Sequence, residues 1–143
     1  MLIEPRIVNF PQGLPGFEQY HDFQFIPEEE APLAHLISVQ EDKVGFILMR
    51  PEVYFPEYLK EIDVDEESIK VLKVKEDIPV DVWVILTLNR QEMAKTTANL
   101  RAPILFNTVA GIGVQVIFND DQYLSRQLLF AENAQPQKEG AVG

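Results

Sequence analysis

Few residues in this chain combine the type and the spacing that catalysis or metal binding requires. The two histidines, His21 and His35, lie too far apart for the His-Glu-x-x-His pattern that holds zinc on one helix face. Ser38, Ser68 and Ser125 all lack the Gly-x-Ser-x-Gly context that exposes a nucleophilic serine on a tight turn. The sequence also has no cysteine and no Gly-Lys-Ser/Thr phosphate loop. We therefore expect no catalytic residue, no metal site and no cofactor.

The densest group of ligand-type side chains is the acidic segment 57–67. A calcium loop of the EF-hand type that starts at Asp63 needs glycine at position 68 and glutamate at position 74, where this chain has Ser68 and Val74. Paired carboxylates also act as acid and base in glycoside hydrolysis, but that chemistry requires surroundings that raise the pKa of one of them. A highly charged segment is solvated and provides no such surroundings. The segment is therefore interpreted as a solvated, acidic helix start rather than as a catalytic site.

Segment 57–67 and the aromatic residues beside it form a candidate partner-binding surface. Six carboxylates fall within this segment, with Lys60 as the only basic interruption. Aromatic side chains often anchor protein interfaces. In the alternative interpretation, the aromatic residues belong to the core and the carboxylates are simply solvated. The candidate contact residues are Tyr54, Phe55, Glu57, Tyr58, Glu61, Asp63, Asp65, Glu66 and Glu67.

The overall charge restricts the class of partner. The chain has 23 acidic and 12 basic side chains, a formal net charge of −11. Because nucleic-acid affinity comes largely from basic groups, direct binding to RNA or DNA is not expected, whereas a basic protein would be attracted. No basic-then-apolar leader and no apolar run of membrane-spanning length occur in the sequence. With the absence of cysteine, these features predict a soluble cytoplasmic protein without membrane contact.

The apolar segments that must position these residues are short and are separated by turn signals, which is typical of an all-β domain. Segment 81–88 is apolar at both alternating sets of positions, so it predicts a central strand covered on both faces. Within 44–49, even-numbered residues should face one side of the sheet and odd-numbered residues the other. Further strands are expected at 2–10, 23–26, 34–40, 96–101, 103–107 and 114–118, with 34–40 and 44–49 forming a hairpin.

Between these strands, residues 65–72 form the best helix candidate, because Asp65 can cap its N-terminus and two glutamates follow. Pro103 has no N–H to donate, so it should mark a strand start, an edge or a bulge. We expect one domain over residues 1–130 and a polar, flexible tail over 131–143. Irregular connections or single helical turns are expected at 51–59 and 89–95, and turns at 11–16 and 111–113.

Two short motifs carry a family resemblance. The first is Gly-Leu-Pro-Gly-Phe-Glu at residues 13–18, and the second is Asn-Leu-Arg-Ala-Pro-Ile at residues 99–104. In this order and spacing they resemble the FliW family of flagellar assembly factors. The pairing of Gln115 with Tyr123 and Arg126 is similar to the closing segment of that family. The family-motif residues, for which we expect structural roles more than partner contacts, are Gly13, Pro15, Gly16, Phe17, Glu18, Asn99, Pro103, Asn107 and Gln115.

The resemblance implies both a fold and a function. The fold would be a mainly antiparallel, β-barrel-like pseudobarrel with minor helical content. The function would be binding of flagellin in the cytoplasm and, once flagellin is exported, binding of the RNA-binding translational regulator CsrA. CsrA would then release the flagellin messenger, so that flagellin synthesis follows secretion. Nothing in this implied role requires catalysis.

Two other functions remain open at this point. In one, the chain is a small-molecule-binding or enzymatic β-barrel in which Asn99, Asn107 and Gln115 converge on a ligand at the barrel mouth. The competing structural interpretation is that these three amides bond backbone groups at bulges and strand ends. In the other, the protein is a structural subunit that associates with itself. The hydrogen-bond partners of these three amides therefore distinguish the two interpretations, a ligand pocket or a structural role.

Overall fold

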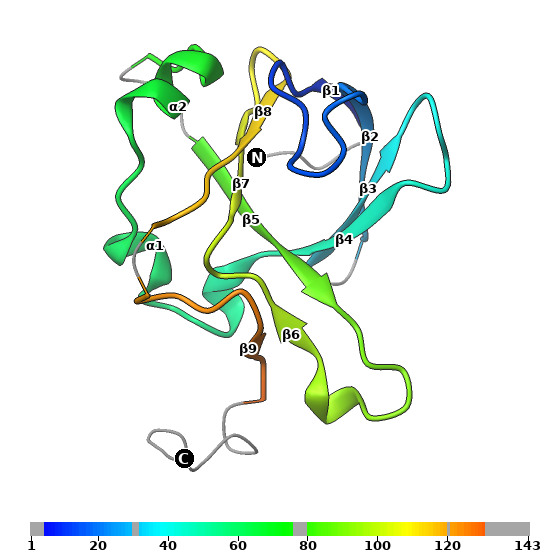
Figure 1. Cartoon of the computed structure of the whole chain (residues 1–143), viewed down its shortest axis with the longest axis vertical. Coiled ribbons are helices and arrows are strands. Elements are labelled where there is room, and N and C mark those ends of the chain that lie inside the picture. The colour runs from blue at the N-terminus through cyan, green and yellow to red at the C-terminus, as the bar shows by residue number, and fades with distance from the viewer. Residues whose placement is uncertain (1–4, 30–31, 76–79, 120, 131–143) are drawn as a thin grey trace.

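A computed structural model describes residues 5–29, 32–75, 80–119 and 121–130 of the chain. Short strands dominate it, as the sequence predicts (Figure 1). The helical elements are α1 (Tyr58–Glu61), α2 (Glu66–Leu72) and the 3-10 turns η1 (Pro51–Val53) and η2 (Met93–Lys95). The strands are β1 (Arg6–Asn9), β2 (Asp22–Pro27), β3 (Leu33–Ser38), β4 (Gly45–Met49), β5 (Val80–Thr87), β6 (Thr97–Ala98), β7 (Ile104–Asn107), β8 (Ile112–Gln115) and β9 (Gln127–Leu128).

The sheet closes on itself. Seven strands follow the order β4-β3-β2-β1-β8-β7-β5, and pairing of β5 with β4 completes the barrel. All of these pairs are antiparallel except β1 and β8, which run parallel and share the single register pair Asn9 and Ile112. Strands β6 and β9 extend the sheet from the end of β5, and α1 and α2 lie apart from each other on the same side of the molecule (Figure 1). The predicted antiparallel barrel with minor helical content is confirmed.

Successive side chains of β4 and β5 point alternately into the barrel and away from it, so they contribute to two apolar clusters, one inside the barrel and one outside. Phe46, Leu48 and Trp83 point into the barrel and join the cluster that fills it. Met49 and Val84 point outward and pack under the C-terminal segment with Leu129 and other residues. A third cluster lies between α2 and the outer face of β7 and β8. The predicted division of 44–49 between the two sides of the sheet and the predicted coverage of 81–88 on both faces are therefore confirmed.

The barrel interior is filled mainly by aromatic rings. Phe10 meets Phe23 and Phe106 edge to face, with ring centroids 5.4 and 5.8 Å apart. Phe10 also explains a glycine inside strand β8, because a Cβ on Gly113 would lie 2.6 Å from the Phe10 ring. Edge-to-face aromatic pairs stabilise a packed interior beyond the area they bury. The barrel is therefore a solid core.

Helix α2 begins and ends close to the predicted limits. The Asp65 side chain caps it by accepting hydrogen bonds from the Ser68 amide and hydroxyl, at 3.2 and 2.7 Å. The expected hairpin of β3 and β4, the irregular 51–59 segment and the strand start after Pro103 are also confirmed. Residues 2–4 of the expected strand 2–10 and the expected tail 131–143 lie outside the described residues. Within the described part of the chain, no helix has the length and apolar character needed to cross a membrane.

Two predicted strands have the wrong limits. The expected strand 96–101 is only β6, because the chain turns at Asn99. The expected strand 114–118 is instead Ile112–Gln115, so it ends before Val116, and the predicted turn at 111–113 was wrong for Ile112 and Gly113. Gly113 is needed within the strand because its backbone packs closely against the Phe10 ring. Phe10 is distant in the sequence, so the local pattern around Gly113 did not indicate this role. The short strand β9 was not predicted.

Candidate functional site

An open groove of about 530 Å³ runs along the start of α2 and the residues that follow β8. We call it the acidic groove. Three of the predicted contact residues, Asp63, Asp65 and Glu67, lie on one side of it. Gln115 and Ile117 line the other side, and Ile117 is 54% exposed. The groove thus combines carboxylates with an exposed apolar side chain, which suits a protein segment that carries both basic and apolar residues.

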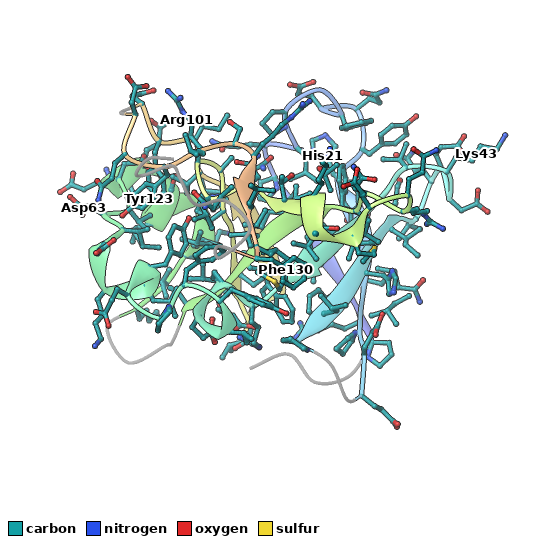
Figure 2. The ribbon with its side chains drawn as sticks, turned by 90° about the horizontal axis from the view of Figure 1, so that it is seen from below. His21, Lys43, Asp63, Arg101, Tyr123 and Phe130 are labelled. Carbon is teal, nitrogen blue, oxygen red and sulfur yellow. The ribbon has the colours of Figure 1, made fainter. Side chains whose placement is uncertain are left out.

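Local structure fixes the direction of these carboxylates. Asp65 is held at the N-terminus of α2 by Ser68, and the hydrogen bond from the Ser68 side chain lowers the pKa of Asp65 below its ordinary value. Asp63 precedes this cap and Glu67 follows it, and both side chains are exposed. Figure 2 shows Asp63 at the edge of the molecule, on the side opposite Lys43. None of the described residues that line the groove is basic, so its carboxylates remain available to a partner's cations.

The remaining predicted carboxylates are also exposed. Glu57 and Glu61 lie on or beside α1, and Glu66 begins α2. Lys60 approaches Glu57 at 3.7 Å, but both side chains are largely exposed. An exposed ion pair of this kind contributes little stability, so it leaves the negative potential of the segment nearly intact. The whole 57–67 segment therefore presents an acidic face next to the groove.

The predicted aromatic anchors behave differently from the carboxylates. Tyr58 is 2% exposed, and its hydroxyl donates a 2.6 Å hydrogen bond to the carbonyl of Leu100. Burial, with a smaller contribution from Tyr123, raises the pKa of the Tyr58 hydroxyl above its ordinary value. Phe55 also packs against the apolar cluster outside the barrel that contains Met49 and Leu129. Tyr58 is thus a core residue and offers no surface to a partner, which corrects its inclusion among the contact residues.

Tyr54 is the exception among these aromatics. It is 41% exposed and packs edge to face on Phe130, with 6.0 Å between ring centroids. It lines a different, apolar pocket and not the acidic groove. The surface predicted from the sequence is therefore divided, with carboxylates at one place and the exposed aromatic ring at another.

The first family motif forms a rigid loop at the end of β1. Gly13 and Gly16 have φ angles of +68° and +86°, which glycine adopts without strain. The Gly16 amide donates to the carboxylate of Glu18 at 3.0 Å. Phe17 packs edge to face on Phe46 of β4, at 5.5 Å between ring centroids. Pro15 is exposed at the tip, so the loop is anchored from inside and presents a fixed outer surface.

The three amide side chains bond backbone groups. The Asn99 Oδ1 atom accepts from the amides of Arg101 and Ala102, both at 3.1 Å. Gln115 donates to the carbonyl of Ala102 at 3.0 Å. The Asn107 side chain donates to the carbonyl of Leu72 at 2.8 Å and accepts from the amides of Val109 and Ala110 at 3.0 and 3.1 Å.

The positions of the three amide side chains decide whether they could form one ligand pocket. Asn107 is 1% exposed and ties the end of β7 to the end of α2. Of the three, only Gln115 lines the acidic groove. They therefore do not converge on one ligand pocket within the described part of the chain. Pro103 is buried immediately before β7, where its missing N–H is tolerated.

Metal-binding chemistry has no support in the geometry. Among the described residues, no three His, Cys, Asp or Glu side chains are grouped so that they could hold a metal ion. A ring nitrogen of His21 lies 2.8 Å from the carbonyl of Phe10, and a ring nitrogen of His35 lies 2.9 Å from the Glu28 carboxylate. Both histidines are engaged in local contacts.

Sequence reasoning missed several residues of the groove. Gln12, Ile117 and Asn119 line it, although nothing in their local sequence indicates a site. Arg101 holds this region in place, because its guanidinium donates to the carbonyls of Phe118 and Asn119 at 2.9 and 3.2 Å. These contacts join parts of the chain that are distant in sequence, so only the folded barrel brings them together.

Comparison with known proteins gives a consistent result. A family model described as "FliW protein" matches residues 2–129. The flagellar assembly factor FliW of Anoxybacillus flavithermus is 37% identical over 134 residues, which cover 94% of this chain and 90% of that protein. For FliW of Geobacillus thermodenitrificans the identity is 40%, with coverages of 90% and 88%. A crystal structure of a flagellar assembly factor FliW matches with a TM-score of 0.78 at 39% identity, over 88% of this chain and 86% of that chain.

Proposed function

This chain belongs to the FliW family of flagellar assembly factors, and from this membership we propose that it binds flagellin in the cytoplasm. When flagellin has been exported, the free protein binds the translational regulator CsrA and antagonises it. Flagellin synthesis is thereby coupled to flagellin secretion. The protein acts by binding alone and performs no catalysis.

The observation that carries the CsrA part of the proposal is the acidic groove. Its carboxylates have no basic neighbour among the described lining residues, and the protein as a whole has a net charge of −11. An RNA-binding regulator holds phosphates with basic groups, and such a surface is attracted to an acidic one. Complementary charge accelerates encounter and selects the partner. The exposed Ile117 beside the carboxylates supplies an apolar contact that charge alone does not provide.

Antagonism of RNA binding follows from the same charges. An acidic domain docked on the regulator repels phosphates near the RNA site, whether or not it covers that site. A coupling of about 1–3 kcal/mol between the two binding events changes RNA affinity roughly 5–150-fold. Flagellin prevents this effect by occupying the protein first, so that free regulator is left to bind the messenger.

The test uses three purified components: this protein, and flagellin and CsrA from the same bacterium. Calorimetry should detect a complex with each partner, and a labelled flagellin leader RNA should leave CsrA when this protein is added. Addition of flagellin should restore the RNA complex. Absence of binding to both partners would refute the proposal, and binding of flagellin without RNA release would refute its CsrA part.

A further inference from the structure

A second pocket has the opposite charge. It has a volume of about 420 Å³ and is formed by the connection from β5 to β6 together with the C-terminal segment. We call it the cationic pocket, because Arg90, Lys95 and Arg126 line it and none of its described lining residues carries a carboxylate. The entire chain has only 12 lysine and arginine residues against 23 acidic ones. Three cations around one pocket are therefore a local reversal of the molecule's charge.

The cations of this pocket are largely available. Arg90 and Arg126 are exposed, and within the described residues neither forms an ion pair or a side-chain hydrogen bond. Lys95 pairs with Glu92 at 3.1 Å, but both side chains are more than 60% exposed, so water and salt weaken the pair. Nothing among the described side chains neutralises the two arginines. The pocket can therefore receive a negatively charged group.

An apolar pocket of about 180 Å³ adjoins the cationic pocket, and Leu88 lines both. Its walls include Leu129 and Phe130 from the C-terminal segment. Tyr54 and Met93 stand at this pocket with 41% and 52% of their surface exposed. Its size suits one apolar side chain. An exposed apolar hollow beside unpaired cations is an arrangement that interfaces with proteins use.

The two pockets are held in a fixed relationship. Thr87 and Thr97 pair across β5 and β6 in the cationic pocket, and the neighbouring Thr96 lines the apolar pocket. The Thr96 hydroxyl accepts from the Asn89 amide at 3.2 Å, and the Asn89 side chain accepts from the Glu92 amide at 2.9 Å. Strand β9 pairs with β6 beside them (Figure 1). A surface organised in this way binds without a large ordering cost.

We propose that the cationic pocket and the apolar pocket together bind an acidic, apolar protein segment. One apolar side chain of that segment enters the apolar pocket, and a carboxylate next to it pairs with Arg90 and Arg126. A nucleic acid fits less well, because the net charge of −11 repels a phosphate backbone and the apolar hollow has no phosphate to bind. Within the part of the chain that the structure describes, these two pockets and the acidic groove share no lining residue. The domain thus has two separate docking surfaces of opposite charge.

The first experiment maps binding by nuclear magnetic resonance on the isotopically labelled full chain. The probe is a capped peptide of leucine and glutamate, with a leucine–lysine peptide and a serine–glutamate peptide of the same length as controls. The leucine–glutamate peptide should shift amide signals within 88–97 and 126–130. The control peptides should leave these signals in place, because each lacks one of the two required groups.

Variants then separate charge from packing. Arg90→Gln with Arg126→Gln should weaken binding of the leucine–glutamate peptide about fivefold, since exposed charge pairs contribute modestly. Lys43→Gln with Lys70→Gln removes the same charge from exposed positions elsewhere and should leave the affinity unchanged. Met93→Ser, at an exposed rim position of the apolar pocket, should also weaken binding of the leucine–glutamate peptide, because it removes an apolar contact and leaves the two arginines in place. Unchanged folding of each variant is verified by its unfolding midpoint.

Several outcomes would overturn the proposal. Equal shifts with the leucine–lysine peptide would show that charge does not select the ligand. Shifts confined to the acidic groove would place the site elsewhere. If the amide signals of residues 88–97 shift when the protein alone is concentrated, the occupant is a second copy of this chain. If an oligouridine RNA shifts these signals and the peptide does not, the occupant is a nucleic acid. These results do not depend on whether flagellin or CsrA binds.

Discussion

Asn99 and Gln115 hold the backbone of the same residue, Ala102, from its two sides. The Asn99 side chain accepts the Ala102 amide at 3.1 Å, and the Gln115 side chain donates to the Ala102 carbonyl at 3.0 Å. Next along the chain, Pro103 leads directly into β7, and its carbonyl accepts from the Val116 amide at 3.0 Å. The two amides therefore fix the turn that aligns β7 with the chain leaving β8.

Removal of the Asn99 side chain should destabilise this turn. Asn99→Ala leaves the amides of Arg101 and Ala102 without their acceptor, which should lower the free energy of unfolding by about 1–3 kcal/mol. Urea unfolding measures the loss. Asn99→Asp keeps the acceptor oxygen and is the matched control, with a smaller effect. An unchanged unfolding midpoint together with weakened flagellin or CsrA binding would instead make Asn99 a contact residue.

The two glycines of the first family motif should differ in their response to alanine. Both need positive φ, so each substitution should cost about 1–2 kcal/mol in backbone strain. A Cβ on Gly13 would also lie 2.8 Å from the Cα of Glu18, whereas a Cβ on Gly16 meets nothing within 4 Å. Gly13→Ala should therefore reduce stability at least about twice as much as Gly16→Ala. Equal losses in thermal unfolding would contradict the described loop.

Burial of the Tyr58 hydroxyl predicts a loss of stability in alkali. Its pKa is raised in the folded protein, so folding favours the neutral phenol. The stabilisation is complete below the unfolded pKa of about 10 and is lost as pH rises from there toward the higher folded pKa. Tyr58→Phe should flatten this decline, although loss of the bond to Leu100 lowers stability at neutral pH. Urea midpoints from pH 8 to 11.5 test this, and identical alkaline slopes for both proteins would exclude Tyr58 as the cause.

Neutralising the acidic groove should change the rate of CsrA binding more than the fold. Asp63→Asn with Glu67→Gln removes two exposed carboxylates from the groove and should slow association by about two- to fivefold at low salt. The salt dependence of association should also become shallower, because these charges act over roughly a Debye length. Stopped-flow measurements across a salt series provide the test. Glu29→Gln with Asp42→Asn is the matched control, and equal slowing in that control would mean that only total charge matters.

Local patterns predicted the regular part of the fold. Segments 44–49 and 81–88 are apolar at both alternating sets of positions, so strand geometry distributes their side chains between the barrel interior and the outer cluster, and Asp65 marks the start of α2 by its capping chemistry. The limits of β6 and β8 were missed for a different reason. Asn99 turns the chain through bonds to its own neighbours, and Gly113 is required by Phe10, which lies far away in sequence.

The difference between local patterns and contacts between distant residues also applies to the candidate binding surfaces. The acidic character of 57–67 is local information, and the structure leaves all of its carboxylates exposed. The burial of Tyr58 depends on Leu100 and Tyr123, which no local pattern reveals. The cationic pocket unites Arg90 with Arg126, which are distant in sequence, and the pairing of β6 with β9 brings their segments together. Sites made from one segment can thus be predicted from sequence, and sites assembled by the barrel cannot.

The single register pair between β1 and β8 has a consequence for how the protein is made. Arg6 also reaches across this seam to the carbonyl of Thr108, 102 residues along the chain. A ribosome therefore releases β1 long before its neighbour β8 exists. During that interval the nascent meander β1 to β4 has an unpaired edge, at which another emerging chain could add a strand. The length of this interval is set by how soon β8 is synthesised, because β8 supplies the partner that covers the edge of β1.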